Sequence, residues 1–503
     1  MAQRITSTAA EASAGESTLA GGRRRLGIPA VTFMIIAASA PLTVVAGGNP
    51  TSFAITGIVG LPLGYLIIGI VLLVFISGYL AMSRSVVNAG AFYAYVAQGI
   101  GRPFGVGAAF IALIAYNMMQ VGIYGLLGYT VSSMLQGWFG ISVAWWVPAA
   151  VAIVIVGILG ANRVDVSMRV LVGLVSLEFV VVIAFNIAAV FVAPEGVSGA
   201  AWNLSAIAQP GFGVVLASAF AAFMGFESGA IYSEESRNPR RTVARATYFA
   251  VVIIAVFYAI SAWCMTVAVG PSHVIALSQK VGPDMFFEVL SGTLGKTASD
   301  LANVLFVTSI MAALISFHNA VARYLFSLGR DGALPRPLSR LSSRAGAPIA
   351  GSLAQTAIAV AVLVGFILFS GLWKPPAGFS PEMYPVATLF NWLTTTGALG
   401  LVILMFMVSI AVVMFFRKGL GQAGLWARAI APTISGFVLL VLIWAILSNF
   451  NILLTGNPTA PITPATIILP SLLFAAGVIG VIWGLVMRAR RPYAYSRVGH
   501  SVD

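Results

Sequence analysis

The stretch that decides the fold lies near the start of the chain, where an apolar run is interrupted by proline and glycine. It reads Ile35-Ile36-Ala37-Ala38-Ser39-Ala40-Pro41-Leu42-Thr43-Val44-Val45-Ala46-Gly47-Gly48-Asn49-Pro50. Proline removes a backbone hydrogen-bond donor and glycine relaxes the chain, so both residues can unwind a helix inside an apolar segment. A second interrupted run reads Ala221-Ala222-Phe223-Met224-Gly225-Phe226-Glu227-Ser228-Gly229-Ala230. We therefore expect two apolar helices that each break part-way along their length.

The composition around these runs is that of a protein that uses lipid as its solvent. Of the 503 residues, 59% are hydrophobic and 8% are charged, whereas soluble domains carry about a quarter charged residues. In lipid every backbone polar group must be satisfied internally, which leaves helix bundles and closed barrels. The apolar runs are about 20 residues long and do not alternate with period two, so helices are favoured. The sequence predicts an all-α integral membrane protein with about twelve transmembrane helices.

Charge placement supports this topology. The apolar spans cover residues 28–52, 54–82, 103–135, 143–161, 170–193, 211–233, 247–270, 298–322, 348–371, 386–415, 429–452 and 465–487. With the N-terminus inside, 24 of the 27 Lys and Arg residues are cytoplasmic, and Lys280, Lys296 and Lys374 are outside. This is the positive-inside rule. It predicts a multi-pass protein of the cytoplasmic (plasma) membrane, surrounded by lipid, with both termini cytoplasmic. It also accounts for the net charge of +13 without a nucleic-acid partner.

The two breaks fall in spans one and six, which are five spans apart. Breaks in corresponding positions of two halves indicate an inverted-repeat transporter whose site lies between them. The alternative is that Gly and Pro, which are common in membrane helices, only kink these two spans.

Two blocks of sequence then resemble a known family. The first is Phe223-Met224-Gly225-Phe226-Glu227 followed by Glu234-Glu235-Ser236-Arg237-Asn238-Pro239-Arg240-Arg241, and it resembles the sixth helix and following loop of the amino acid–polyamine–organocation superfamily. The second is Asn319-Ala320-Val321-Ala322-Arg323-Tyr324, then Gly329-Arg330-Asp331-Gly332-Ala333-Leu334-Pro335 and Gly346-Ala347-Pro348, and it is similar to the loop after helix eight. The resemblance implies a LeuT-like five-plus-five inverted repeat followed by two peripheral helices. It also implies secondary transport of an amino acid or, alternatively, of a polyamine or small amine.

One motif departs from the family pattern. Many members carry a G-x-G-I-F-like sequence at the first break, whereas this chain has Ser39-Ala40-Pro41-Leu42 leading to Gly47-Gly48. A backbone break is still expected there, but contacts of the first helix do not transfer residue by residue.

The resemblance sets the expected domain organisation. We expect a disordered cytoplasmic tail at 1–25, a transporter domain at 26–490 and a cytoplasmic tail at 491–503. Within the transporter domain, helices one to five cover about 28–193, helices six to ten about 211–415, and helices eleven and twelve about 429–487. Arg23–Arg25 followed by Ala38-Ser39-Ala40 could also mimic a signal peptide, but its removal would disturb the regular topology.

Only two of the 14 acidic residues fall within the spans, Glu178 and Glu227. A charge inside the bilayer is costly, so such residues face the bundle interior and tend to be functional. Glu227 follows the second break. It can hold the break open, accept a substrate amine or carry a proton, or it can lock the helices by accepting N–H bonds from the unwound strand of span one. Glu178 can carry a proton or tie span five to its neighbours. Both are candidates for proton coupling, and sodium is the open alternative.

The substrate site is expected at the breaks. An unwound helix exposes N–H groups that suit a carboxylate and carbonyls that suit an ammonium group. In span three, Asn117, Gln120 and Tyr124 share one helical face, which can contact substrate or join helices. The expected substrate-binding residues are Ser39, Ala40, Pro41, Leu42, Thr43, Tyr116, Asn117, Gln120, Phe223, Met224, Gly225, Phe226 and Glu227. Thr394–Thr396 and Ser309 have the same two interpretations, contact with substrate or joining of helices. His318 is expected to form a gate or to pack helices together.

Other function classes are disfavoured. Cys264 is the single cysteine, and His273, His318 and His500 are scattered, so neither a metal site nor a cofactor is expected. The spans hold no Asp, no paired carboxylates and no Ser/His/Asp grouping, which argues against a membrane-embedded enzyme. No span carries a charged ring or a filter-like glycine run, which argues against a channel.

Overall fold

The computed structural model describes residues 27–86, 91–162, 168–227, 239–342, 347–370 and 379–499. Within these ranges the chain is helical and forms no strand. Ten of the described helical segments are long and apolar enough to cross a membrane, and two shorter apolar helices accompany them. This confirms the predicted all-α class. The tail predicted at 1–25 lies outside the described residues, as does the end of the tail predicted at 491–503.

The long apolar segments follow the predicted spans closely. Their bounds are α2 Ile28–Ala38 with η1 Thr43–Gly48 and α3 Asn49–Thr56, α4 Leu61–Ser83, α6 Arg102–Phe139, α8 Met168–Val192, α10 Pro239–Val269, α13 Lys296–Arg330, α14 Ile349–Leu368, η7 Val386–Phe390 with α15 Asn391–Arg417, η8 Trp426–Ile430 with α16 Ala431–Ser448, and α18 Pro464–Arg490. The two shorter apolar helices are α7 Trp146–Ala161 and α9 Phe212–Ala222.

Several boundaries differ from the predicted ones; the seventh helix, for example, begins at Pro239 and not at 247. The first span runs to Thr56 rather than 52, and it ends at Gly57, whose φ of 64° supplies a left-handed helix cap. The eighth continues to Arg330 instead of ending at 322. The sixth stops at Ala222, and of its predicted length, residues 228–233 lie outside the described part. Apolar content alone predicts the membrane-buried part of a helix, and not where its polar ends stop.

Several short helices lie in segments that were expected to be loops. They are α5 Ala91–Gly99, η2 Ala200–Trp202, η3 Leu204–Ala208, α11 Val274–Val281, α12 Asp284–Leu294, η5 Arg336–Ser339, η6 Pro381–Met383, α17 Phe450–Thr455 and α19 Pro492–Arg497. In α12 the side chains of Met285, Phe286 and Phe287 are buried, while the helix is only 11 residues long. A helix this short and only partly apolar gives no membrane-span signal.

Helix α6 lies at the centre of the bundle and packs closely against α15 and α18 through glycine. A Cβ atom at Gly397 of α15 would lie 2.7 Å from the carbonyl oxygen of Ala115. A Cβ atom at Gly480 of α18 would lie 2.7 Å from the Cα of Gly107, and one at Gly484 would lie 2.7 Å from the Cα of Pro103. Such small residues let membrane helices approach until their backbones touch.

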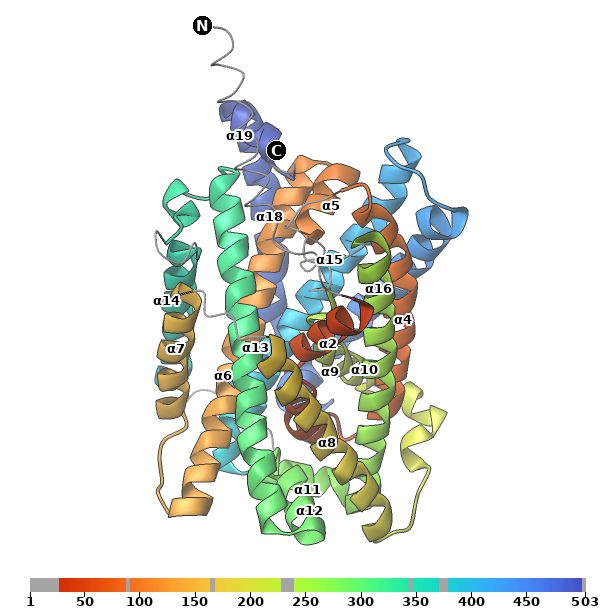
Figure 1. Ribbon diagram of the computed structural model, residues 1–503, viewed down its shortest axis with the longest axis vertical. Helices are drawn as coiled ribbons and strands as arrows, with labels where there is room; N and C mark the ends of the chain where they lie inside the picture. Colours follow the sequence, from red (N-terminus) through yellow and green to blue (C-terminus); the bar gives the residue numbers. More distant parts are fainter. Residues whose placement is uncertain are drawn as a thin grey trace, which may run out of the picture.

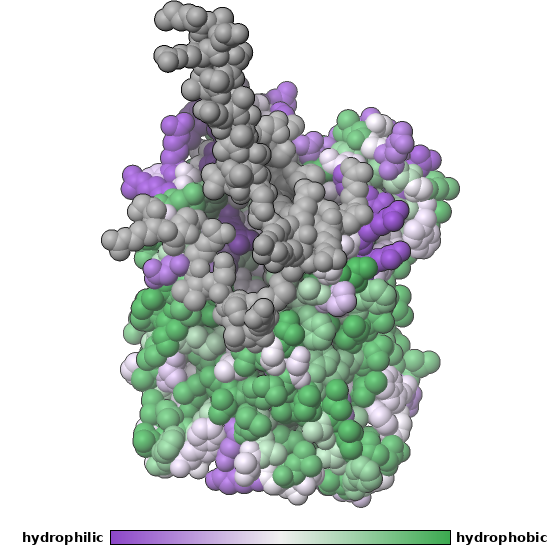
Figure 2. Space-filling view, in the orientation of Figure 1, coloured by the Kyte–Doolittle hydropathy of each residue, from purple (hydrophilic) through white to green (hydrophobic). Residues whose placement is uncertain are grey.

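The outside of the bundle suits a lipid environment. Helices α7 and α14 pack side by side along one edge of Figure 1, and α11 and α12 lie at the end opposite α19. In Figure 2, hydrophilic residues gather at the end of the molecule that carries α19, and a broad hydrophobic band lies below them. Large apolar side chains are exposed on the peripheral helices, among them Phe437, Trp444 and Ile467. Because water penalises contiguous exposed apolar surface of this kind, the band is the surface that lipid would cover.

Candidate functional site

The first predicted break is present at Ser39 and Ala40. Helix α2 closes with hydrogen bonds from the N–H of Ser39 to the Ile36 oxygen (3.0 Å) and from the N–H of Ala40 to the Ala37 oxygen (3.1 Å). Ala40 has a φ of 44°, and it is the one non-glycine residue with positive φ in the described ranges. Pro41, which has no N–H, follows it. Such a conformation costs about 1–3 kcal/mol, so the surrounding contacts must hold it.

The second predicted break follows α9 and touches the first. Residues 223–225 form a turn, in which Gly225 has a φ of 106°. A Cβ atom at Gly225 would lie 2.8 Å from the carbonyl oxygen of Ala38. Only glycine fits both this φ and this approach. The two interrupted segments are therefore adjacent, as the sequence predicts.

Glu178 of α8 is bonded to the first break. Its Oε2 atom accepts hydrogen bonds from the backbone N–H of Leu42 (3.2 Å) and from the hydroxyl of Ser309 (2.9 Å). The Ser309 oxygen in turn accepts from the hydroxyl of Thr43 (3.0 Å). Glu178 is 3% exposed. These hydrogen bonds connect α8 and α13 to the start of the second half of the first span. The backbone N–H of Leu42, which was expected to be available to the substrate, is therefore already bonded to a side chain.

Glu227 is bonded to the second break. Its Oε1 atom accepts from the hydroxyl of Tyr116 (2.6 Å) and its Oε2 atom from the N–H of Gly225 (3.0 Å). The Tyr116 ring centroid lies 6.3 Å from that of Phe317 and 5.6 Å from that of Tyr324. Each break thus has one buried or half-buried carboxylate that accepts one of its N–H groups. The N–H group that Glu227 accepts comes from its own break, whereas the expected lock would have accepted N–H groups from the first span.

A cavity lies against both breaks. Four of the expected substrate-binding residues line it, namely Ser39, Ala40, Thr43 and Met224. The other expected residues do not border it: Pro41, Leu42, Tyr116, Asn117, Gln120, Phe223, Gly225, Phe226 and Glu227. The structure therefore divides the expected set between the cavity wall and residues that do not border the cavity.

Several cavity residues were not expected from the sequence. Thr51 and Ser52 come from α3, Tyr65 from α4, and Met119 and Ile123 from α6. Further unexpected lining comes from Ser218, Phe390 and Asn391, whereas contact with substrate was already one of the two interpretations of Thr394 and Thr395, which also line the cavity. A signal for the first pair existed, because the polar run 49–52 directly follows the glycine pair of the broken span. The α6 pair are apolar residues on either side of Gln120, and nothing in the sequence separates them from ordinary core residues.

Gln120 belongs to a separate buried network. Its side-chain nitrogen lies 3.3 Å from the Tyr124 hydroxyl and 3.2 Å from Nδ1 of His318, and its oxygen accepts from Gln355. His318 Nε2 lies 2.8 Å from the Ser352 hydroxyl. With the Gln120 amide donating to Nδ1, the ring must be the neutral Nε2–H tautomer. The network joins α6, α13 and α14, which is the helix-joining role expected of His318.

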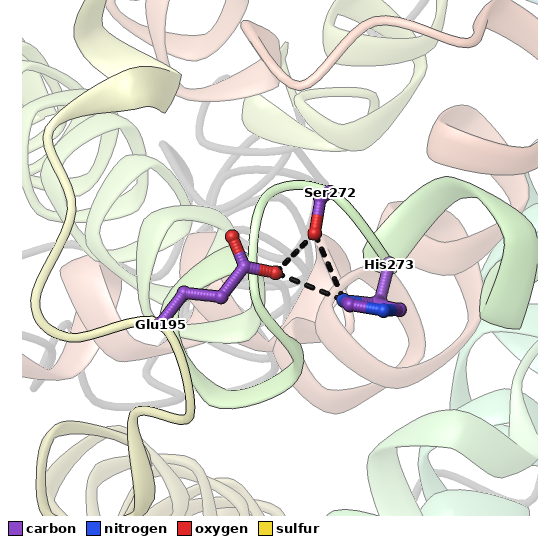
Figure 3. A network of polar contacts seen from close by, with 3 residues as sticks. All are labelled: Glu195, Ser272 and His273. Carbon is purple, nitrogen blue, oxygen red and sulfur yellow. Dashed lines mark hydrogen bonds and ion pairs between the residues drawn. The ribbon is translucent and has the colours of Figure 1, made fainter.

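A second polar cluster lies on exposed loops at the end of the molecule opposite α19. Figure 3 shows the Glu195 carboxylate, the Ser272 hydroxyl and the His273 ring converging. Nδ1 of His273 lies 2.9 Å from both Glu195 Oε1 and the Ser272 hydroxyl, which also donates to Oε1. Hydrogen bonds from Ser272 and His273 lower the pKa of Glu195 below its ordinary value. One ring nitrogen faces both partners, so the geometry is that of a contact between loops and not of a proton relay to a nucleophile.

Comparison with known proteins supplies the family. The family described as "Amino acid permease" matches residues 30–497, which is nearly the whole chain and includes both breaks and the cavity. This chain belongs to the amino acid permease family. It is thereby a member of the amino acid–polyamine–organocation superfamily and a multi-pass membrane protein, as its sequence predicts.

Curated relatives of the permease are remote. It is 28% identical over 199 residues to the Branched-chain amino acid permease BcaP of Bacillus subtilis (strain 168), a match that covers 38% of each chain. It is 29% identical over 149 residues to the Lysine-specific permease LysP of Lactococcus lactis subsp. cremoris (strain MG1363), covering 29% of each. With the Aromatic amino acid transport protein AroP of Escherichia coli (strain K12) it shares 23% identity over 354 residues, which is 66% of this chain and 72% of the relative. The first two matches span well under half of those relatives, and the three printed names differ in substrate.

Proposed function

We propose that this permease moves an amino acid across the cytoplasmic membrane by alternating access, with the substrate held at the two adjacent helix breaks. The observation that carries the proposal is the cavity bordered by Ser39 and Ala40 of the first break and by Met224 of the second. Unwound backbone offers both donors and acceptors to a zwitterion, and here the unwound segments touch each other. Both termini are cytoplasmic in this proposal, because that orientation places the basic loops inside.

The proposed architecture has twelve spans in a five-plus-five inverted repeat with two peripheral helices. The ten long apolar helices and the two shorter ones, α7 and α9, support this number of spans. The breaks fall in spans one and six, which are the corresponding positions of two five-helix halves. Helices α16 and α18 are the peripheral pair, and both carry large exposed apolar side chains.

Proton coupling is assigned to Glu178. The carboxylate accepts hydrogen bonds from Leu42 at the first break and from Ser309 of α13. Both bonds can form only while the broken span and α13 lie next to α8. A buried carboxylate that loses its donors is expensive in a low-dielectric interior, and its neutral form then becomes the favoured one. Movement of the broken span away from α8 would in this way drive proton uptake. Glu227 is the second coupling candidate, and its bonds to Tyr116 and Gly225 make it first a support for the break.

The test is uptake of labelled amino acids into proteoliposomes that contain the purified permease. We expect saturable uptake that accumulates against a gradient when the pH outside is lower than inside, and no accumulation when a protonophore removes the gradient. A parallel experiment imposes a sodium gradient with the same pH on both sides. Accumulation driven by sodium alone would contradict the assigned coupling ion, and absence of any amino acid uptake would contradict the transport function.

A further inference from the structure

The wall of the cavity is uncharged over its described residues. None of the 21 lining residues is Asp, Glu, Lys, Arg or His. The two acids nearest to it, Glu178 and Glu227, do not border it, and each already accepts two hydrogen bonds from the protein. A cationic side chain in this cavity would therefore meet no carboxylate on the described part of the wall.

Most of the cavity wall is apolar, and its apolar residues come from several helices. Val44, Met119, Ile123, Met224, Phe317 and Phe390 contribute aliphatic, thioether and aromatic surface. These residues suit an apolar side chain, because burial of apolar surface is favourable and burial of an unpaired ammonium group is not.

One polar group on the wall is both fully buried and without a partner in the described part of the chain. Ser52 is 2% exposed and borders the cavity, and its hydroxyl makes no hydrogen bond within the described part of the chain. The neighbouring Thr51 differs, because its hydroxyl donates to the Gly47 oxygen of its own helix (2.7 Å). A buried hydroxyl without a partner costs about 1–3 kcal/mol, so Ser52 is the side chain that gains most from a polar group placed in the cavity.

We propose that the cavity selects zwitterionic amino acids with uncharged, apolar side chains, and that the Ser52 hydroxyl hydrogen-bonds to the bound amino acid. This inference rests on the proposed transport function and narrows its substrate class. It disfavours cationic amino acids and polyamines, which need a carboxylate on the wall. The substrate's own charged groups bind to backbone groups at the breaks other than the N–H groups of Leu42 and Gly225, which carboxylates already hold, and its side chain lies against the apolar wall.

Norleucine and ornithine form a matched pair for the test, because their side chains have the same length and differ in a terminal methyl or ammonium group. Pentylamine and putrescine are the corresponding compounds without the carboxylate. Binding is measured on the purified full-length permease as a ligand-induced rise in melting temperature, and transport is measured as competition against labelled leucine uptake in proteoliposomes.

We expect norleucine to bind and compete at concentrations at least about 100-fold lower than ornithine, which is the order of penalty for an unpaired charge inside a membrane protein. Both amines should be weaker than norleucine. Ornithine or putrescine acting as well as norleucine would overturn the inference, and so would the absence of binding by all four compounds. Binding of norleucine over ornithine without uptake of any amino acid would support the selectivity and contradict transport, so the two failures are distinguishable.

Variants at Ser52 test its role. Ser52→Ala should weaken norleucine binding by about tenfold, which is the order of one hydrogen bond, and should raise the melting temperature of the empty protein, because the unpaired buried hydroxyl is removed. Ser52→Asp should move the norleucine-to-ornithine preference at least about tenfold towards ornithine, because it supplies the missing carboxylate. Thr247→Val is the control, since that buried hydroxyl donates only within its own helix, to Val243 (2.9 Å). Unchanged binding in Ser52→Ala, or an unchanged preference in a folded Ser52→Asp, would refute the assignment to Ser52.

Discussion

The backbone N–H of Leu42 donates to Oε2 of Glu178 across 3.2 Å. Leu42 begins the second half of a broken membrane helix, where N–H groups have no partner within the helix. Glu178 comes from a helix more than a hundred residues further along the chain and supplies that partner. The carboxylate thus stabilises the break and at the same time makes its own environment depend on the position of the broken span.

The two roles of Glu178 can be separated by substitution. Glu178→Gln keeps an oxygen that accepts from Leu42 but cannot release a proton, so exchange of labelled for unlabelled substrate should persist while pH-driven accumulation is lost. Glu178→Ala removes the acceptor and leaves two buried donors unpaired at about 1–3 kcal/mol each, so both activities should be lost. Exchange and accumulation are measured in proteoliposomes, with Glu382→Gln as the control. Full accumulation by Glu178→Gln would show that the coupling proton is carried elsewhere.

The contact between the breaks should be intolerant of a methyl group. In Gly225→Ala the new Cβ would lie 2.8 Å from the Ala38 oxygen, on a residue whose φ is 106°. We expect a loss of stability of about 1–3 kcal/mol and loss of substrate binding, both followed by thermal unfolding in detergent. Gly365→Ala is the matched control, because no atom lies within 4 Å of its Cβ position and alanine favours a helix. Equal stability and equal substrate binding in the two variants would contradict a role for the close contact between the breaks.

The buried network around His318 should contribute stability. His318→Ala removes one hydrogen-bond partner from Gln120 and one from Ser352, at about 1 kcal/mol for each bond, and opens a void beside Gly160, which packs against the ring. We expect the melting temperature in detergent to fall by several degrees. His273→Ala removes a side chain that is 74% exposed and should leave the melting temperature nearly unchanged. If the melting temperature fell equally in both variants, the buried network around His318 would not be the source of the stability.

The Glu195 cluster should respond to acid. Its carboxylate has a lower pKa in the folded than in the unfolded chain because Ser272 and His273 hydrogen-bond to it. Such a group stabilises the fold at pH values above its unfolded pKa, and this contribution is lost as the pH falls through the folded pKa. Hydrogen exchange of 270–281 should therefore be slower in the wild type than in Glu195→Gln near neutral pH, and the difference should vanish below the ordinary glutamate pKa. A difference that persists in acid would show that the loops are held by other contacts.

The sequence predicts the helices and the breaks well because both are set locally. Lipid demands about 20 apolar residues for each span, and Pro41 and Gly225 act on the backbone where they stand. The side-chain partners are another matter. Nothing near Glu178 in the sequence indicates Leu42, because their contact depends on how two distant helices are rotated and tilted.

The polar face of span three shows the same limit. Periodicity predicts that Gln120 points into the bundle, and it does. The bundle interior, however, is divided into the cavity and the His318 network, and a helical period does not choose between them. Ser52 was missed for the opposite reason: its hydroxyl lacks the local partner that Thr51 has, and that difference appears only once the helix is built.

The glycine contacts of α6 also limit how the molecule can move. Where Gly480 and Gly484 bring the backbone of α18 against Gly107 and Pro103, no layer of side chains remains to rearrange, so one helix cannot slide along the other. A motion that opens the cavity would therefore move α6 and α18 together as one rigid unit. In the proposed transport cycle the hinges would then lie elsewhere, at the junctions where helix meets unwound chain.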